Sequence, residues 1–161
     1  LYLGAVGFTT GVIGVFMTVG AVTQVVGSTA AGFASDRWGR WKPLVAGILA
    51  GSAAFLVLVF TGEFAWMMVT FVLLGLAGGA LAAVPSAMLG ETKYGSTGLA
   101  VALYWIIFDI AAIIGPLASG IIADNVGFAP AFLVIQIPFI LTLACALWAW
   151  RWDAKRKRAA P

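Results

Sequence analysis

Long apolar runs separated by short polar connections dominate this sequence. Five of the runs have about the 20 residues that cross the hydrocarbon core of a bilayer as a helix. None shows the two-residue alternation of a membrane β-barrel strand, and lipid-embedded backbone otherwise requires helices. The pattern therefore predicts an all-α integral membrane chain with the end of one helix at residues 1–6 and five complete spans, about 12–33, 44–60, 64–89, 98–123 and 129–150.

Charge supports these spans and orients them. Hydrophobic residues make up 63% of the chain, against about 45–50% in soluble domains. Successive connections should lie on alternate sides of the membrane. All Lys and Arg then fall on one side: Arg37, Arg40, Lys42, Lys93, Arg151, Lys155, Arg156, Lys157 and Arg158. The connections on the opposite side carry only the acidic Glu63 and Asp124. The positive-inside rule makes the basic side cytoplasmic, and residues 151–161 are then a basic cytoplasmic tail.

The most polar connection is residues 35–43, the charged hairpin. It holds Asp36, Arg37, Arg40 and Lys42 within seven positions. Gly39 can take the positive φ of a sharp reversal. Such a cluster must lie in water or at headgroups, so the hairpin is either a solvated turn at the cytoplasmic face or a specific ionic contact.

The spacing around the hairpin resembles a known signature. Gly32, Ser35, Asp36, Arg37, Gly39 and Arg40 fit G-x-x-[A/S]-D-R-x-G-R, which resembles the cytoplasmic loop motif of the major facilitator superfamily, although Ala34 stands where Leu is usual. Gly115 and Pro116 open a run that resembles the G-P elements of its exporters. The resemblance implies one six-helix half of the major facilitator fold. The basic tail and the lack of an intramembrane Arg in span 64–89 favour the C-terminal half, and we expect the chain to be a fragment whose partner is the missing N-terminal half.

Small residues indicate how the helices pack. Gly75, Gly79 and Ala83 recur every four residues, and so do Ala111, Gly115, Ser119 and Ala123. Such stripes let helix backbones approach closely in lipid. Pro85, Pro116 and Pro138 each interrupt a span and free a carbonyl. Gly115 and Pro116 are the predicted bend of their helix, although static helices also contain such breaks.

Asp109 is the leading candidate for chemistry. It lies about 16 Å beyond Gly98 at 1.5 Å per residue, near the bilayer centre. A charged side chain there costs about 2.5–3.5 kcal/mol on insertion scales. No Lys or Arg lies within a span. We expect Asp109 to be neutralised by a proton, a cationic solute or a residue of the missing half, and the alternative is a hydrogen bond that packs helices.

Four further residues are candidates for the same site. Trp105 lies one helical turn before Asp109, with Tyr104 beside it, and could form an apolar wall and a cation–π surface for a guest. Trp105 could equally contact lipid or a neighbouring helix. Gln24 lies in the middle of its span and is a candidate cavity residue, and so is Gln136.

Together these features predict part of a secondary active transporter, with proton-coupled efflux of a small amphipathic or drug-like solute by alternating access. The alternatives are an uptake symporter for sugar or organic acid, and a non-transporting sensor or assembly subunit. We do not expect an enzyme, because the chain has no His and one deep Asp. The expected partners are the lipid bilayer, the solute and protons, in the inner membrane, without nucleic acid, metal or cofactor. Cys145 is the sole Cys, so no disulfide forms within the chain.

Overall fold

The computed structural model describes residues 2–60, 62–91 and 97–159. Its regular structure within these ranges is entirely helical, which confirms the predicted all-α class. The helices are α1 (Tyr2–Ala5), α2 (Thr10–Trp38), α3 (Trp41–Phe60), α4 (Phe64–Gly90), α5 (Thr97–Val126) and α6 (Phe128–Ala159). In this part of the chain, α2 to α6 are each long and apolar enough to cross a membrane.

The charged hairpin is tighter than the sequence predicts. Helix α2 does not end near residue 33 but continues to Trp38, and α3 begins at Trp41 rather than at residue 44. Only Gly39 and Arg40 connect the two helices, and Gly39 has a φ of 87°. Charge does not stop a helix that leaves the hydrocarbon, whereas a left-handed glycine does.

The later helices are also longer than predicted. Helix α5 runs on to Val126, and Gly127, with a φ of 95°, connects it to α6. Helix α6 does not end at Trp150 but continues to Ala159. Lys and Arg have high helix propensity, so the basic sequence extends the helix. Lys93 and the side chains of Arg156, Lys157 and Arg158 lie outside the described residues.

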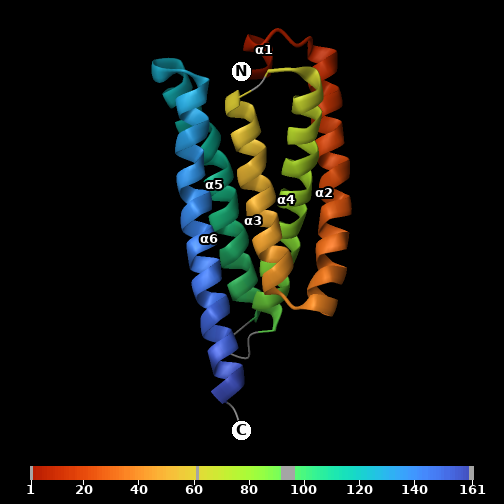
Figure 1. Ribbon diagram of the computed structural model, residues 1–161, viewed down its shortest axis with the longest axis vertical. Helices are drawn as coiled ribbons and strands as arrows, with labels where there is room; N and C mark the ends of the chain where they lie inside the picture. Colours follow the sequence, from red (N-terminus) through yellow and green to blue (C-terminus); the bar gives the residue numbers. More distant parts are fainter. Residues whose placement is uncertain (1, 61, 92–96, 160–161) are drawn as a thin grey trace.

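The five long helices lie side by side with their axes roughly aligned (Figure 1). Successive helices alternate in direction, so the α2–α3 connection lies at the same end as the C-terminus and the α3–α4 and α5–α6 connections lie at the other. Helix α4 packs against α2, α3 and α5, and α6 packs against α3 and α5. The buried core lies mainly on α2, α3 and α4 and includes Phe16, Ile48 and Met67.

Glycines bring α2 and α4 into close contact, as the stripe on residues 75–83 predicts. A Cβ atom on Gly27 of α2 would lie 2.8 Å from the Cα of Leu76 in α4. A Cβ atom on Gly79 of α4 would overlap the backbone carbonyl of Gln24 in α2. Since no hydrophobic force drives helices together in lipid, this backbone contact supplies much of the packing of the pair.

The second predicted stripe, on α5, is only partly packed. Ala111 and Gly115 are exposed, whereas Ser119 and Ala123 are half-buried. A Cβ atom on Gly115 would meet nothing within 4 Å among the described residues. Helix α5 continues through Pro116 as a helix, and a bend at this pair stays a prediction.

Candidate functional site

Arg40 organises the end of the molecule that carries the α2–α3 connection, which we call the charged end. Its Nη1 donates to Ser35 Oγ at 2.6 Å and to Asp36 Oδ1 at 2.8 Å. Its Nη2 donates to Glu91 at the end of α4. Arg40 therefore links the last turn of α2 to the last turn of α4. Among the described residues, Arg37 forms no ion pair, so its expected part in a latch stays a prediction.

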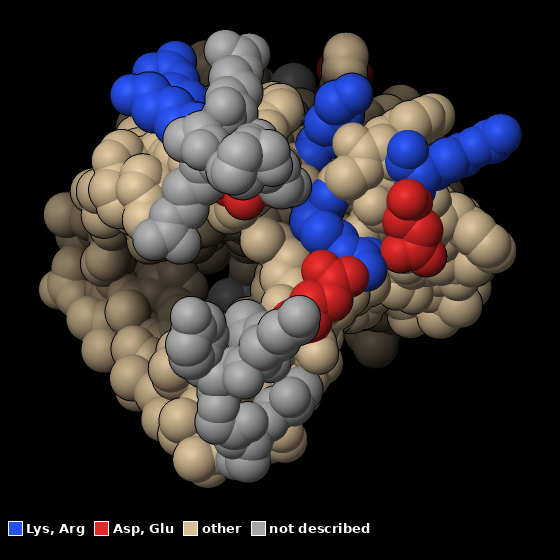
Figure 2. All heavy atoms as spheres, turned by 90° about the horizontal axis from the view of Figure 1, so that it is seen from below, with Lys and Arg blue, Asp and Glu red and all other residues tan. Residues whose placement is uncertain are grey.

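Electrostatics keep Arg40 charged. The hydrogen bond with Glu91 is the main reason why the pKa of Arg40 rises above its ordinary value, and Asp36 adds to it. An increased pKa means that folding favours the protonated guanidinium. The stability that Arg40 gains from its two carboxylate partners is therefore lost only when the pH rises through this increased pKa. Arg40 thus holds both carboxylates at every physiological pH. Figure 2 shows basic and acidic side chains gathered on this end of the molecule.

The same end contains a cavity of about 800 Å³. Asp36, Arg40 and Glu91 line it, together with Trp41 and Asp153. Trp41 Nε1 donates to Asp153 Oδ2 at 3.1 Å. This bond ties the start of α3 to the extension of α6, so the segment predicted as a tail packs against the charged hairpin.

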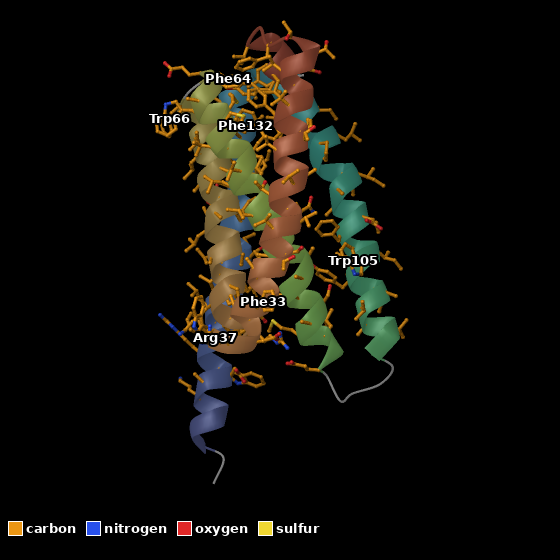
Figure 3. All side chains as sticks on the ribbon, turned by 90° about the vertical axis from the view of Figure 1, so that its right-hand side faces the viewer. Phe33, Arg37, Phe64, Trp66, Trp105 and Phe132 are labelled. Carbon is orange, nitrogen blue, oxygen red and sulfur yellow. The ribbon has the colours of Figure 1, made fainter. Side chains whose placement is uncertain are left out.

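Asp109 lies near the middle of α5 and is exposed. It makes no ion pair with the residues that the structure describes. Trp105, one turn earlier, contacts Tyr104 and Phe108, with ring centroids 5.7 Å and 5.4 Å away. Figure 3 places Trp105 on α5 nearer the end that carries Arg37 than the end that carries Phe64. Three aromatic rings next to Asp109 in the sequence thus pack together on α5, and their grouping with the acid into one site stays a prediction.

Two faces of α5 differ in chemistry. Trp105, Asp109 and Pro116 share one side of the helix by their three- and four-residue spacing. An exposed stripe of large aliphatic residues follows the same spacing on another side: Leu99, Leu103, Ile106, Ile110, Ile113 and Leu117. Such a stripe suits lipid, whereas a lone carboxyl suits a cavity or a partner. Asp109 lies three residues after Ile106 and four before Ile113, so it is at the edge of this stripe, between the stripe and Trp105.

Tyr104 joins α5 to α4 through a carbonyl that a proline leaves free. Pro85 lies inside α4 and cannot donate to the carbonyl of Leu81, four residues earlier. Tyr104 Oη donates to that carbonyl at 2.7 Å. The phenol thus replaces the missing hydrogen bond of the helix, which gives Tyr104 a structural role beside its predicted place near the site.

We expect Tyr104→Phe to lower the free energy of unfolding by about 0.6–1.7 kcal/mol, the range of hydrogen bonds between membrane helices. In a Pro85→Ala background the cost should fall, because the backbone N–H of the introduced alanine can itself donate to the carbonyl of Leu81. Unfolding titrations of the two single variants and the double variant in detergent give the coupling free energy between Tyr104 and Pro85. An equal cost of Tyr104→Phe in both backgrounds would contradict this role.

The two glutamines differ in position. Gln24 is exposed on α2, and its side chain lies beside Gly78 of α4. Helix α4 contacts both α2 and α5, and no hydrogen bond joins Gln24 to Asp109 within the described residues. Gln136 is buried; its Nε2 donates to the carbonyl of Ser52, and its Oε1 accepts from Ser52 Oγ at 2.6 Å. Gln136 thus fixes α6 to α3 and is not a cavity residue of this chain.

Several of these contacts cannot be read from the sequence. The link from Arg40 to Glu91 joins residues 51 positions apart, and the one from Ser52 to Gln136 joins residues 84 apart. Ser52 and Gln136 carry one weak signal, which is a polar side chain within an apolar run. Within the described residues, no group of three or more His, Cys, Asp or Glu could hold a metal ion.

The fold and these sites define a multi-pass helical membrane protein with an ionic cluster at one end and an acid on a membrane helix. The sequence model of the Major Facilitator Superfamily matches residues 1–161, so the chain belongs to this superfamily of transporters. This finding confirms the family that the charged hairpin predicts. Comparisons with curated proteins and with solved structures gave no significant match.

Proposed function

We propose that this chain is part of a transporter that exports a small amphipathic or drug-like solute in exchange for protons. Membership of a transporter superfamily supports a secondary transporter with a solute site at mid-membrane. The particular substrate class rests on Asp109 and Trp105. An aromatic ring one turn from a carboxyl suits a guest with both an apolar surface and a positive charge.

The observation that carries the proposal is the environment of Asp109. It lies at mid-helix, at the edge of the aliphatic stripe of α5, without an ion pair to any described residue. A carboxyl in such a place is stable when protonated or when a cation is bound. Competition between a proton and a cationic solute for one carboxyl is a direct way to couple their opposite movements.

We further propose that Arg40 and its partners form a latch on the cytoplasmic side of the inner membrane. The side chains of Asp36 and Glu91 are 70% and 60% exposed, so water screens their ion pairs with Arg40. Pairs of this kind contribute about 0–1 kcal/mol each. Contacts of that strength can hold one state and still break in each cycle, when this chain rocks against the expected N-terminal half. Gly115 and Pro116 would let α5 bend in the same movement.

Everted membrane vesicles that carry the full-length protein test the proposed function. With an acidic lumen, we expect the lipophilic cation ethidium to accumulate inside as protons leave, and a protonophore to abolish the accumulation. Vesicles without the protein provide the control. Ethidium that leaves together with protons would indicate a symporter and contradict export. Ethidium movement that is independent of the proton gradient would contradict coupling.

A further inference from the structure

A second cavity lies between α2 and α3, beside the charged end. Its volume is about 430 Å³, comparable with that of one fatty acyl chain. Nearly all its lining residues are small and apolar, from Gly27 and Ala34 on α2 to Ala46 and Ala50 on α3. Leu76 of α4 also contributes to the lining.

The groove has the dimensions and direction of one membrane leaflet. Gly27 and Trp38 lie on its wall, about 16 Å apart along α2 at 1.5 Å per residue. Half of a hydrocarbon core of about 30 Å is nearly the same length. The groove therefore runs from the charged end to about the bilayer centre, as an acyl chain of that leaflet does.

The mouth of the groove carries a positive charge that pairs with none of the described carboxylates. Lys42 and Trp38 line both this groove and the larger cavity at the charged end. Within the described part of the chain, Lys42 forms no ion pair. The nearby carboxylates are engaged, Asp36 with Arg40 and Asp153 with Trp41. An ammonium and an exposed indole at headgroup depth complement a lipid phosphate.

We propose that this groove binds one anionic glycerophospholipid of the adjacent leaflet. One acyl chain occupies the groove between α2 and α3, and the phosphate contacts Lys42 beside Trp38. The site shares no residue with the region around Asp109, although Lys42 and Trp38 also line the cavity beside the proposed Arg40 latch. Bound lipid would fix the spacing of the two helices that the charged hairpin connects.

Native mass spectrometry of the full-length, delipidated protein tests the site. The probes are dioleoyl phosphatidylglycerol and the zwitterionic dioleoyl phosphatidylcholine, titrated separately in detergent. We expect one tightly held phosphatidylglycerol. Lys42→Gln should weaken it about five-fold, the effect of one basic residue near an anionic surface, with no change for phosphatidylcholine. Arg37→Gln is the matched control, because Arg37 is exposed on the same hairpin but lines neither cavity.

A second pair of variants tests the groove. Ala46→Leu should fill it and weaken both lipids, whereas Ala53→Leu, also exposed on α3 but outside the groove, should change neither. Equal losses of phosphatidylglycerol affinity for Lys42→Gln and Arg37→Gln would overturn the phosphate site. Unchanged binding of both lipids to the Ala46→Leu variant would overturn the acyl groove. A wild-type protein that retains no phosphatidylglycerol would overturn both and indicate that a protein segment fills the groove.

Discussion

Asp109→Asn should lower proton-driven ethidium transport by at least about thirty-fold, which corresponds to the roughly 2 kcal/mol lost when one partner of a buried charge pair is removed. The amide keeps the size of the side chain but can neither release a proton nor attract a cation. Asp109→Glu should retain much of the activity, because it keeps the ionisable group on the same face of α5. Initial rates in everted vesicles, corrected for the amount of protein, measure both effects.

Asp124→Asn is the matched control for this loss. Asp124 lies on the same helix, close to its end at Val126, where a carboxylate is solvated. The same substitution there should leave the rate nearly unchanged. Wild-type rates for Asp109→Asn under an imposed proton gradient would exclude this carboxyl from coupling, whatever the result at Asp124.

Gly79→Leu should destabilise the fold more than any other single change considered. Its side chain would have to occupy the space of the α2 backbone at Gln24 and Ser28, and backbone cannot rotate away as a flexible side chain can. Overpacking typically costs about 1–3 kcal/mol, and we expect the upper end or more, because the two helices must separate. The free energy of unfolding in a denaturing detergent measures the loss.

Gly14→Leu separates this steric effect from the general effect of replacing a glycine. Gly14 lies on α2, and a Cβ atom there would meet nothing within 4 Å among the described residues. Leu favours a helix by somewhat less than about 1 kcal/mol over Gly, so this variant should be neutral or slightly stabilised. If both variants lose the same stability, close backbone packing of α2 on α4 is not what holds the pair together.

Apolar length predicted the number and order of the long helices, because the bilayer fixes the length of a spanning run. The ends of the helices were less predictable. The apolar pattern predicts span ends near residues 33 and 150, but α2 continues to Trp38, where Gly39 follows it, and α6 continues to Ala159. A positive φ is a backbone requirement that only the glycine itself signals.

The partners at the two candidate sites show why contacts resist prediction from sequence. Pro85 signals that the carbonyl of Leu81 is free, yet nothing in the sequence identifies Tyr104 as its donor. Glu91 lies two residues before Lys93 in the sequence, yet it accepts a hydrogen bond from Arg40, in the connection between α2 and α3. Both contacts depend on how helices are placed in space, which local spacing does not determine.

We propose that α5 presents Asp109 to a water-accessible solute path while Ile110 beside it faces lipid. Cysteine labelling tests this claim directly, in a Cys145→Ala background that removes the chain's own thiol. A membrane-impermeant methanethiosulfonate needs a thiolate, which forms in water and not in hydrocarbon. We expect Asp109→Cys to react at least about ten-fold faster than Ile110→Cys, which lies at the same depth on the aliphatic stripe. Equal rates, or no reaction at position 109, would contradict the claim.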